Sequence, residues 1–177
     1  MKKKKNEIAT FQSFGASPDL QNELINSTPR AAVIVGATAI EIQLGRLLEA
    51  FLISDLSEVN KLIDSENMNA PLGTFSSKIR ACYCLGLIAK NEYEDLLKIK
   101  EIRNIFAHHI SDCTFNEPYI KTICDQFKIM SQMQGSSIIP TREKFTLLIY
   151  ALDNVIRFRT NNIQNHKRII PQEMNYR

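Results

Sequence analysis

One long apolar stripe constrains the fold of this chain more than any other feature. Between residues 29 and 51, apolar side chains recur at steps of three and four, at Val33, Ala37, Ile40, Leu44, Leu47 and Phe51. That spacing places them on one side of an α-helix. Polar side chains interrupt the same stretch at Glu41, Gln43, Arg46 and Glu49. The pattern therefore predicts the core helix of a folded domain and not a membrane span.

The remaining sequence is also helical by its periodicity, with no alternating run long enough for a strand. Ser17-Pro18 and Thr28-Pro29 each combine a capping residue with a proline suited to a first helical turn. Further helices are expected over the ranges 57–63, 75–85, 91–108, 116–130 and 141–156. We therefore predict a single-domain all-α bundle of six to seven helices over residues 17–160. Basic tails are expected at 1–16, which we predict to be flexible, and at 161–177.

Several local signals set the expected helix ends. Gly86 breaks the chain between two helices, and Asn91 with Glu94 resembles a capping box for the second of them. Asn116 and Pro118 are expected to start the helix at 116–130. Thr141 is expected to cap the last helix.

The charge is divided unevenly along the chain, whose net charge is +3. Residues 1–10 carry four lysines, at positions 2–5, and one glutamate, and residues 157–177 carry five basic residues and one glutamate. The body between them, 11–156, has thirteen basic and seventeen acidic residues. A body of that sign is not suited to contacting many phosphates, so weak nucleic-acid attraction is expected only from the tails.

The composition indicates a cytoplasmic protein. No apolar run follows the basic N-terminus, which argues against a secretory signal. The four cysteines, Cys82, Cys84, Cys113 and Cys124, contain no CxxC pair and are expected to be free and mostly buried. No Gly-rich phosphate loop and no GxSxG motif occurs, so no cofactor is predicted.

The stretch KIRACYCLGLIAKNEYEDLL imitates a helix-turn-helix unit. Its second helix would direct acidic side chains towards DNA phosphates, which would repel them. The relevant polar residues are Asn91, Glu92, Glu94 and Asp95. We therefore interpret this stretch as an ordinary corner between two helices, and we expect no sequence-specific DNA binding by the protein alone.

Two blocks resemble the MtlR family, the mannitol operon repressor and its relatives. These are RAAVIVGATAIEIQLGRLLEAFL and APLGTFSSKIRACYCLGLIAKNEYEDLLKIKEIRNIFAHH. The most specific piece is S-x-K-I-R, G-L-I, then L-x-x-I-x-x-I-R-N-x-F-A-H. The resemblance implies an all-helical regulator of transcription, concerned with sugar uptake, that lacks an evident DNA-binding domain.

The end of the 91–108 helix also resembles the HEPN superfamily, whose ribonuclease members carry arginine, a polar residue and, a few positions on, histidine. Arg103, Asn104 and His108 match that pattern. Metal-independent RNA cleavage needs a base, which histidine can supply, and a cation for the developing phosphorane charge, which arginine can supply. Asn104 lies one turn from His108 and could orient its imidazole. By resemblance, such a site joins two chains in a dimer.

A structural interpretation of the same residues stands beside the catalytic one. Arg103 shares the inner stripe of Leu96, Ile99 and Phe106, so we expect it to be partly buried and paired, with Glu41 or Glu94 as partner or with carbonyls at its own helix end. A histidine at a helix end also interacts favourably with the helix dipole. Loss of a paired Arg103 would then cost about 3 kcal/mol.

Two other groups of polar residues are candidate functional sites, a possible metal site and a pair of glutamates. His108, His109, Asp112 and Cys113 have metal-ligand side chains, but their spacing matches no closed set, so we predict no metal site. Glu41 and Glu49 are two helical turns apart, too far to share a proton, and solvation or ion pairing explains them better.

The sequence therefore predicts a regulatory module of the mannitol-repressor type that acts through a protein partner. A polar helix end beside Phe106 favours a homodimer or higher symmetric oligomer. The alternative is a metal-independent ribonuclease that uses Arg103, Asn104 and His108, with RNA as its substrate. No membrane partner is expected.

Overall fold

The computed structural model describes residues 17–67, 69–108, 113–132, 135, 138–163 and 168–169, and the basic segment 1–16 lies outside them. This part of the chain contains eight helices and no strand, which confirms the predicted all-α single domain. The helices are α2 (Pro18–Asn26), α3 (Pro29–Phe51), α4 (Leu56–Ile63), α5 (Phe75–Cys84), α6 (Lys90–His108), α7 (Pro118–Asp125), α8 (Lys128–Ser131) and α9 (Thr141–Ile163). Helix α9 extends past the boundary predicted at residue 160.

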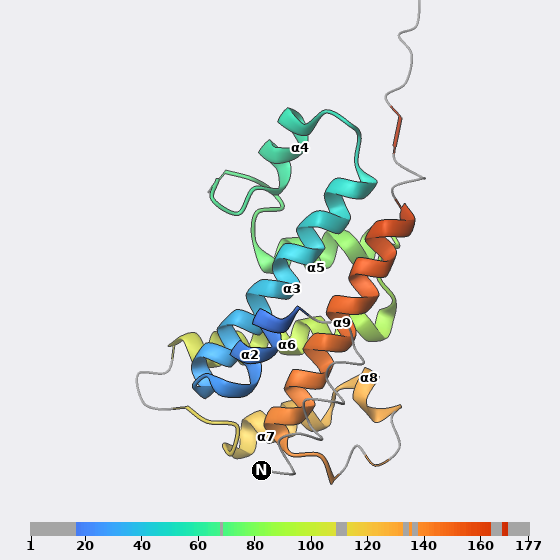
Figure 1. Cartoon of the computed structure of the whole chain (residues 1–177). Coiled ribbons are helices and arrows are strands. Elements are labelled where there is room, and N and C mark those ends of the chain that lie inside the picture. The colour runs from blue at the N-terminus through green and yellow to red at the C-terminus, as the bar shows by residue number, and fades with distance from the viewer. Residues whose placement is uncertain are drawn as a thin grey trace, which may run out of the picture.

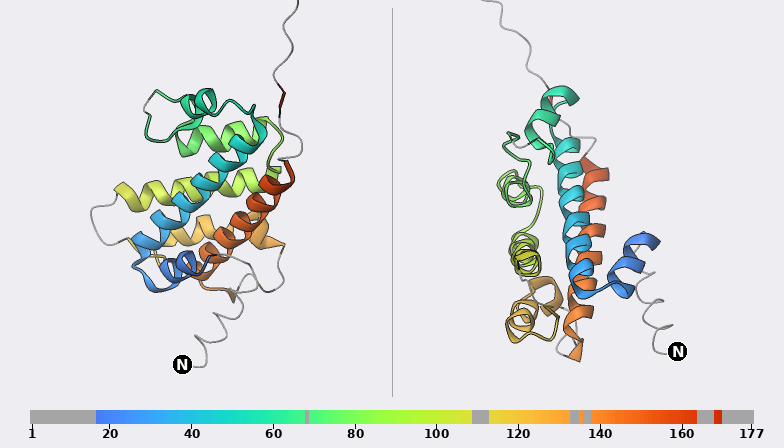
Figure 2. Two further views of the ribbon diagram at one scale, coloured as in Figure 1. Left: turned by 45° about the horizontal axis from the view of Figure 1, so that its top comes forward. Right: turned by 90° about the vertical axis from the view of Figure 1, so that its left-hand side faces the viewer.

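The two longest helices, α3 and α9, form the centre of the bundle (Figure 1). They lie side by side and run in the same direction, and near their C-terminal ends the Arg168 N–H donates to the Phe51 carbonyl at 3.1 Å. Helices α5, α6 and α7 cross one face of this pair, and α2 lies on the other face (Figure 2). The bundle thus has a central layer with a row of crossing helices on one side.

Helix α3 is the core helix that the apolar stripe predicts. All six stripe residues are buried. By length and composition α3 could also cross a membrane, yet half of its most apolar window is buried against other helices. Its partly buried Glu41 lies 3.9 Å from the Lys78 ammonium of α5, so ion pairing accounts for this carboxylate.

The two predicted starts at Ser17-Pro18 and Thr28-Pro29 and the predicted break at Gly86 are confirmed. The Ser17 and Thr28 hydroxyls accept from the N–H groups of Leu20 and Ala31, each at 3.3 Å, and a proline follows each cap. Gly86 ends α5 with a φ of 71°, a backbone conformation that glycine adopts without strain. The Leu87 N–H donates to the Cys82 carbonyl at 2.8 Å and closes this helix end.

Two predicted helix starts differ in the structure, one because of a tertiary contact and one because of a local backbone hydrogen bond. Helix α6 begins at Lys90, and Glu92, not Glu94, accepts from the Ala89 N–H at 2.7 Å. The other Glu92 oxygen accepts from Arg159 of α9 at 2.8 Å, which fixes this register. Thr141 is the first residue of α9 and not its cap, because the Pro140 carbonyl already accepts from Lys144 at 2.9 Å.

The helix predicted over 116–130 is two helices, α7 and α8, and Asp95 of α6 explains the break. Its carboxylate accepts from the N–H groups of Lys128 and Ile129, at 2.7 and 2.8 Å, where α8 begins. The Asp95 side chain is fully buried, and the Lys98 ammonium lies 3.6 Å away. Burial raises the pKa of Asp95, and the two N–H groups and Lys98 oppose that rise.

The carboxylates of the helix-turn-helix imitation do not face outward as expected. Glu92 and Asp95 are buried and bind other parts of the bundle, while Asn91 and Glu94 are half-buried. The expected repulsion of phosphates is therefore the wrong reason to exclude DNA reading. The correct reason is that the first turns of α6 are built into the core.

We predict that Asp95→Ala lowers the free energy of unfolding by about 2 kcal/mol, because two backbone donors lose their acceptor in a buried place. Asp95→Asn should lose less, since the amide keeps one acceptor oxygen. Urea unfolding followed by circular dichroism measures both. The control is Glu101→Ala, an exposed acidic residue on the same helix that should change stability by less than about 0.5 kcal/mol. Equal stability of Asp95→Ala and the control would refute this role.

Candidate interaction surface

A stacked pair of tyrosines joins α5 to α6. The rings of Tyr83 and Tyr93 lie 4.3 Å apart between centroids, with an angle of 17° between their planes. Tyr83 stays 37% exposed, and Leu85, just beyond α5, is 44% exposed. Because each ring is held by the other, the pair presents a fixed aromatic surface to solvent.

Two hollows lie beside these tyrosines and share Arg80. The first, of about 550 Å³, is lined by Arg80, Tyr93, Leu97, Lys100, Glu101, Asn104 and Ile105. The second, of about 370 Å³, is lined by Leu72, Thr74, Ser76, Ser77, Arg80, Ala81 and Cys84. We call these residues, together with Tyr83, the α5–α6 surface. It combines apolar, hydroxyl, aromatic and basic side chains with one carboxylate, Glu101, on α5, α6 and the segment just before α5.

Arg80 and Lys100 give this surface unpaired positive charge. Neither forms an ion pair with any residue that the structure describes. In contrast, carboxylates hold six other cations of the bundle, at Lys61, Lys78, Lys98, Lys144, Arg157 and Arg159. Arg80 and Lys100 thus lie beside the exposed Tyr83 and the half-buried Tyr93, with Glu101 as the one carboxylate of this surface. Cations without an ion pair beside an aromatic stack favour a binding surface over a structural one.

The structure separates the three residues of the predicted catalytic motif. Asn104 is exposed and lines the first hollow, and His108 is exposed at the end of α6. Arg103 is half-buried on the side of α6 that carries Ile99 and Phe106, and it does not line either hollow. Among the described residues, no hydrogen bond joins Asn104 to His108. The motif therefore presents Asn104 and His108, but not Arg103, to the α5–α6 side.

The predicted pairing of Arg103 with Glu41 or Glu94 is wrong. Glu41 instead faces Lys78, which occupies the space between α3 and α5. Within the described ranges, no carboxylate lies within ion-pair distance of Arg103. Helical periodicity alone did not show that a cation of α5, and not one of α6, lies beside Glu41.

The metal-ligand constellation is only partly visible, since His109 and Asp112 lie outside the described residues. Cys113 is buried, and its sulfur lies 3.4 Å from the Tyr119 hydroxyl. No group of three potential ligands occurs among the described His, Cys, Asp and Glu residues. All four cysteines are free and three of them are buried, as predicted, while Cys84 is exposed. Burial raises the pKa of Cys82 and of Cys124 to about 12.

Sequence reasoning did not identify the tyrosine pair or Arg80. The two tyrosines are separated by the Gly86 turn, and their periodicity alone does not indicate that they stack. For Arg80 the sequence did contain a clue, because this residue is the last one of the S-x-K-I-R block that resembles the MtlR family. The neighbouring Lys78 of that block is buried and structural, which leaves Arg80 as the exposed cation of the block.

We predict that Arg103→Ala lowers the free energy of unfolding by about 1 kcal/mol or less, and not by the 3 kcal/mol expected for a buried ion pair. The reason is that truncation strands no carboxylate among the described residues. His108→Ala, at an exposed helix end, should change stability even less. Urea unfolding of both variants measures this difference. A loss near 3 kcal/mol for Arg103→Ala would reveal a partner for its guanidinium.

Comparison with known proteins agrees with this architecture. The family model described as MtlR, mannitol repressor, matches residues 28–166. The solved structures include the X-ray structure of the MtlR-HPr complex from Escherichia coli, with a TM-score of 0.62 and 22% sequence identity, covering 77% of this chain and 94% of that chain. Curated protein sequences give no match. The family match spans well over half of the sequence, and the chain therefore belongs to the MtlR family of mannitol repressors.

Proposed function

We propose that this protein is a cytoplasmic transcriptional regulator of a carbohydrate-uptake operon and acts by binding a protein partner. Family membership carries the regulatory part of the proposal. The partner part is supported by the similar Escherichia coli protein, which was solved in complex with HPr. We propose an HPr protein as the partner of this chain too.

The proposal assigns no DNA reading to the helical bundle. A recognition helix must place the side chains of its first turns in the major groove. In α6 those turns hold Glu92 and Asp95, which are buried against α9 and α8. Freeing them would break the contacts that fix both helices. Any weak, salt-sensitive attraction to DNA is expected from the basic segments at positions 2–5 and 157–177.

The α5–α6 surface is the region proposed to contact the partner. Tyrosine and arginine contribute most often to the binding energy of protein interfaces, and this surface holds both. The Tyr83–Tyr93 stack is already formed, so little side-chain freedom is lost on binding. Arg80 lies between the two hollows and has no carboxylate partner within the described part of the chain. It is available to a partner's acceptor groups.

We predict that the protein binds HPr of its own host and that Arg80→Glu and Tyr93→Ala each weaken binding at least tenfold. The first change reverses an unpaired charge, and the second removes one ring of the stack. Isothermal titration calorimetry measures the dissociation constant, and a tenfold change equals about 1.4 kcal/mol. Arg46→Glu on α3 is the matched control, since it reverses an exposed charge away from this surface.

The possible outcomes test separately whether HPr is the partner and whether it binds at the α5–α6 surface. Absence of binding by the wild-type protein at about 100 μM would refute HPr as the partner. Binding that both surface variants retain would leave the partner in place and refute the surface. An equal loss in Arg46→Glu would indicate a general charge effect and would also refute it.

The ribonuclease alternative rests on the exposure of Asn104 and His108 on one side of α6. It needs Arg103 or another cation to reach the same phosphate, and a second chain in a homodimer or higher oligomer is the proposed source. Under the regulatory proposal, purified protein incubated with tRNA in chelator leaves the RNA intact. Cleavage that disappears in His108→Ala would replace the regulatory proposal with this one.

A further inference from the structure

The first hollow of the α5–α6 surface is a groove that runs along α6. Its α6 residues follow one another at steps of one, three and four, which places them on one side of the helix, at Tyr93, Leu97, Lys100, Glu101, Asn104 and Ile105. From the first to the last of them α6 rises about 18 Å, which is more than three turns. Arg80 of α5 completes the lining. A hollow of this length suits a partner helix laid lengthwise along α6 and not a single inserted side chain.

Apolar side chains form a row along this groove. Leu97 and Ile105 are half-buried, pack against the core and lie eight residues apart, which is about two helical turns. Tyr93 lies one turn before Leu97, and its ring is held in place by the stack with Tyr83. A helix that binds along such a row buries an apolar stripe of its own against it.

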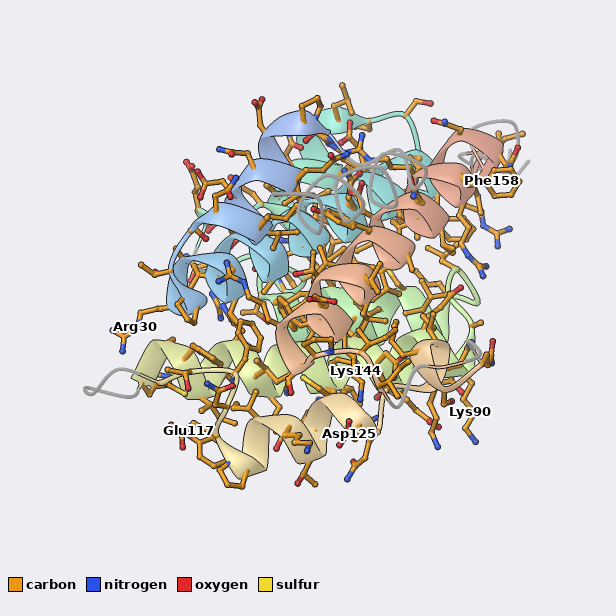
Figure 3. All side chains as sticks on the ribbon, turned by 60° about the horizontal axis from the view of Figure 1, so that its bottom comes forward. Arg30, Lys90, Glu117, Asp125, Lys144 and Phe158 are labelled. Atoms are coloured by element: carbon orange, nitrogen blue, oxygen red, sulfur yellow. The ribbon has the colours of Figure 1, made fainter. Side chains whose placement is uncertain are left out.

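The charges of the groove favour an acidic partner. Arg80 is exposed and Lys100 is half-buried, and neither forms an ion pair within the described part of the chain. Glu101 is the one carboxylate among the described lining residues. Lys144 shows the contrast, because Asp125 of α7 and Lys144 of α9 lie close together and form an ion pair (Figure 3). The two cations of the groove are therefore available to carboxylates of a bound protein.

We propose that this groove binds an amphipathic helix of the partner, whose apolar stripe is flanked by carboxylates. The apolar stripe packs on Tyr93, Leu97 and Ile105, and the carboxylates pair with Arg80 and Lys100. This inference rests on the proposed function, because it describes the element by which the partner is held at the α5–α6 surface.

The test is isothermal titration calorimetry of the full-length chain with HPr of its own host, using two neutralising variants at adjacent positions. Lys100→Gln should weaken binding about threefold or more, because it removes an attraction to the partner's carboxylates. Glu101→Gln should strengthen binding about twofold or more, because it removes a repulsion. Leu97→Ala should weaken binding about tenfold, with circular dichroism as the check that the variant folds. Arg46→Gln, which neutralises an exposed cation elsewhere, is the matched control and should bind as the wild type does.

A second measurement on HPr tests whether the bound element is a helix. The amide signals of isotope-labelled HPr should shift when the full-length chain is added, at spacings of three and four residues along one helix that carries carboxylates beside its apolar stripe. Shifts confined to strands or loops of HPr would overturn this part of the inference.

Each remaining outcome of the titration contradicts the inference in its own way. Opposite signs for Lys100→Gln and Glu101→Gln would show that the partner presents a basic face. Unchanged affinity in both variants would place the partner's charges elsewhere, even if Leu97→Ala does not fold. Absence of wild-type binding at about 100 μM would refute the proposed partner together with this inference, whereas binding with the wrong signs refutes this inference alone.

Light scattering of the free chain tests the other occupant of the groove, a second copy of this chain. Under the inference, Leu97→Ala leaves the molar mass of the free chain unchanged. A dimeric wild type that Leu97→Ala converts to a folded monomer would assign the groove to an interface between copies, and the inference would fail.

Discussion

The close packing of α3 against α9 is the contact on which the rest of the bundle depends. It is made at Gly36, where an added Cβ would lie 3.3 Å from side-chain atoms of Phe145 and of Ile149 and 3.0 Å from Leu24 of α2. A larger residue would push the two long helices or α2 apart. Because α5, α6 and α7 all cross this pair on one face, its spacing sets where the row of crossing helices can pack (Figure 2).

Buried carboxylates of α6 then connect the crossing helices to α9 and to one another. Glu92 ties the start of α6 to Arg159 near the end of α9, and Asp95 starts α8 through two backbone N–H groups. Both residues lie in a stretch that looks like a solvent-facing recognition helix by sequence. Their burial fixes α6, and a fixed α6 in turn holds Tyr93, Lys100 and Asn104 on the α5–α6 surface. Stability and the proposed binding surface therefore use opposite sides of one helix.

Local signals in the sequence predicted the features that depend on neighbours along the chain. The apolar stripe of α3, the caps at Ser17 and Thr28 and the break at Gly86 all follow from spacing within a few residues. The resemblance to the MtlR family was confirmed because its motifs are long and specific. These signals were sufficient for the fold class.

Features that depend on distant residues could not be predicted in this way. Asp95 caps a helix more than thirty positions later, so 116–130 looked like one continuous helix. Glu41 pairs with Lys78, although periodicity alone suggested that it would pair with Arg103. The Tyr83–Tyr93 stack depends on how closely α5 and α6 approach each other after the turn at Gly86. Residue types alone do not indicate that interhelical distance. Side-chain partners across the bundle are set by packing, and only the structure shows them.

The central claim is that this MtlR-family chain acts through a protein bound on the α5–α6 surface. Hydrogen exchange of the full-length chain with and without HPr tests it most directly, because exchange maps the contact without altering any residue. The account predicts slower exchange in the peptides that cover 76–85 and 93–105, with the 29–51 helix unchanged. Slowed exchange confined to other helices, with these two segments unaffected, would contradict it.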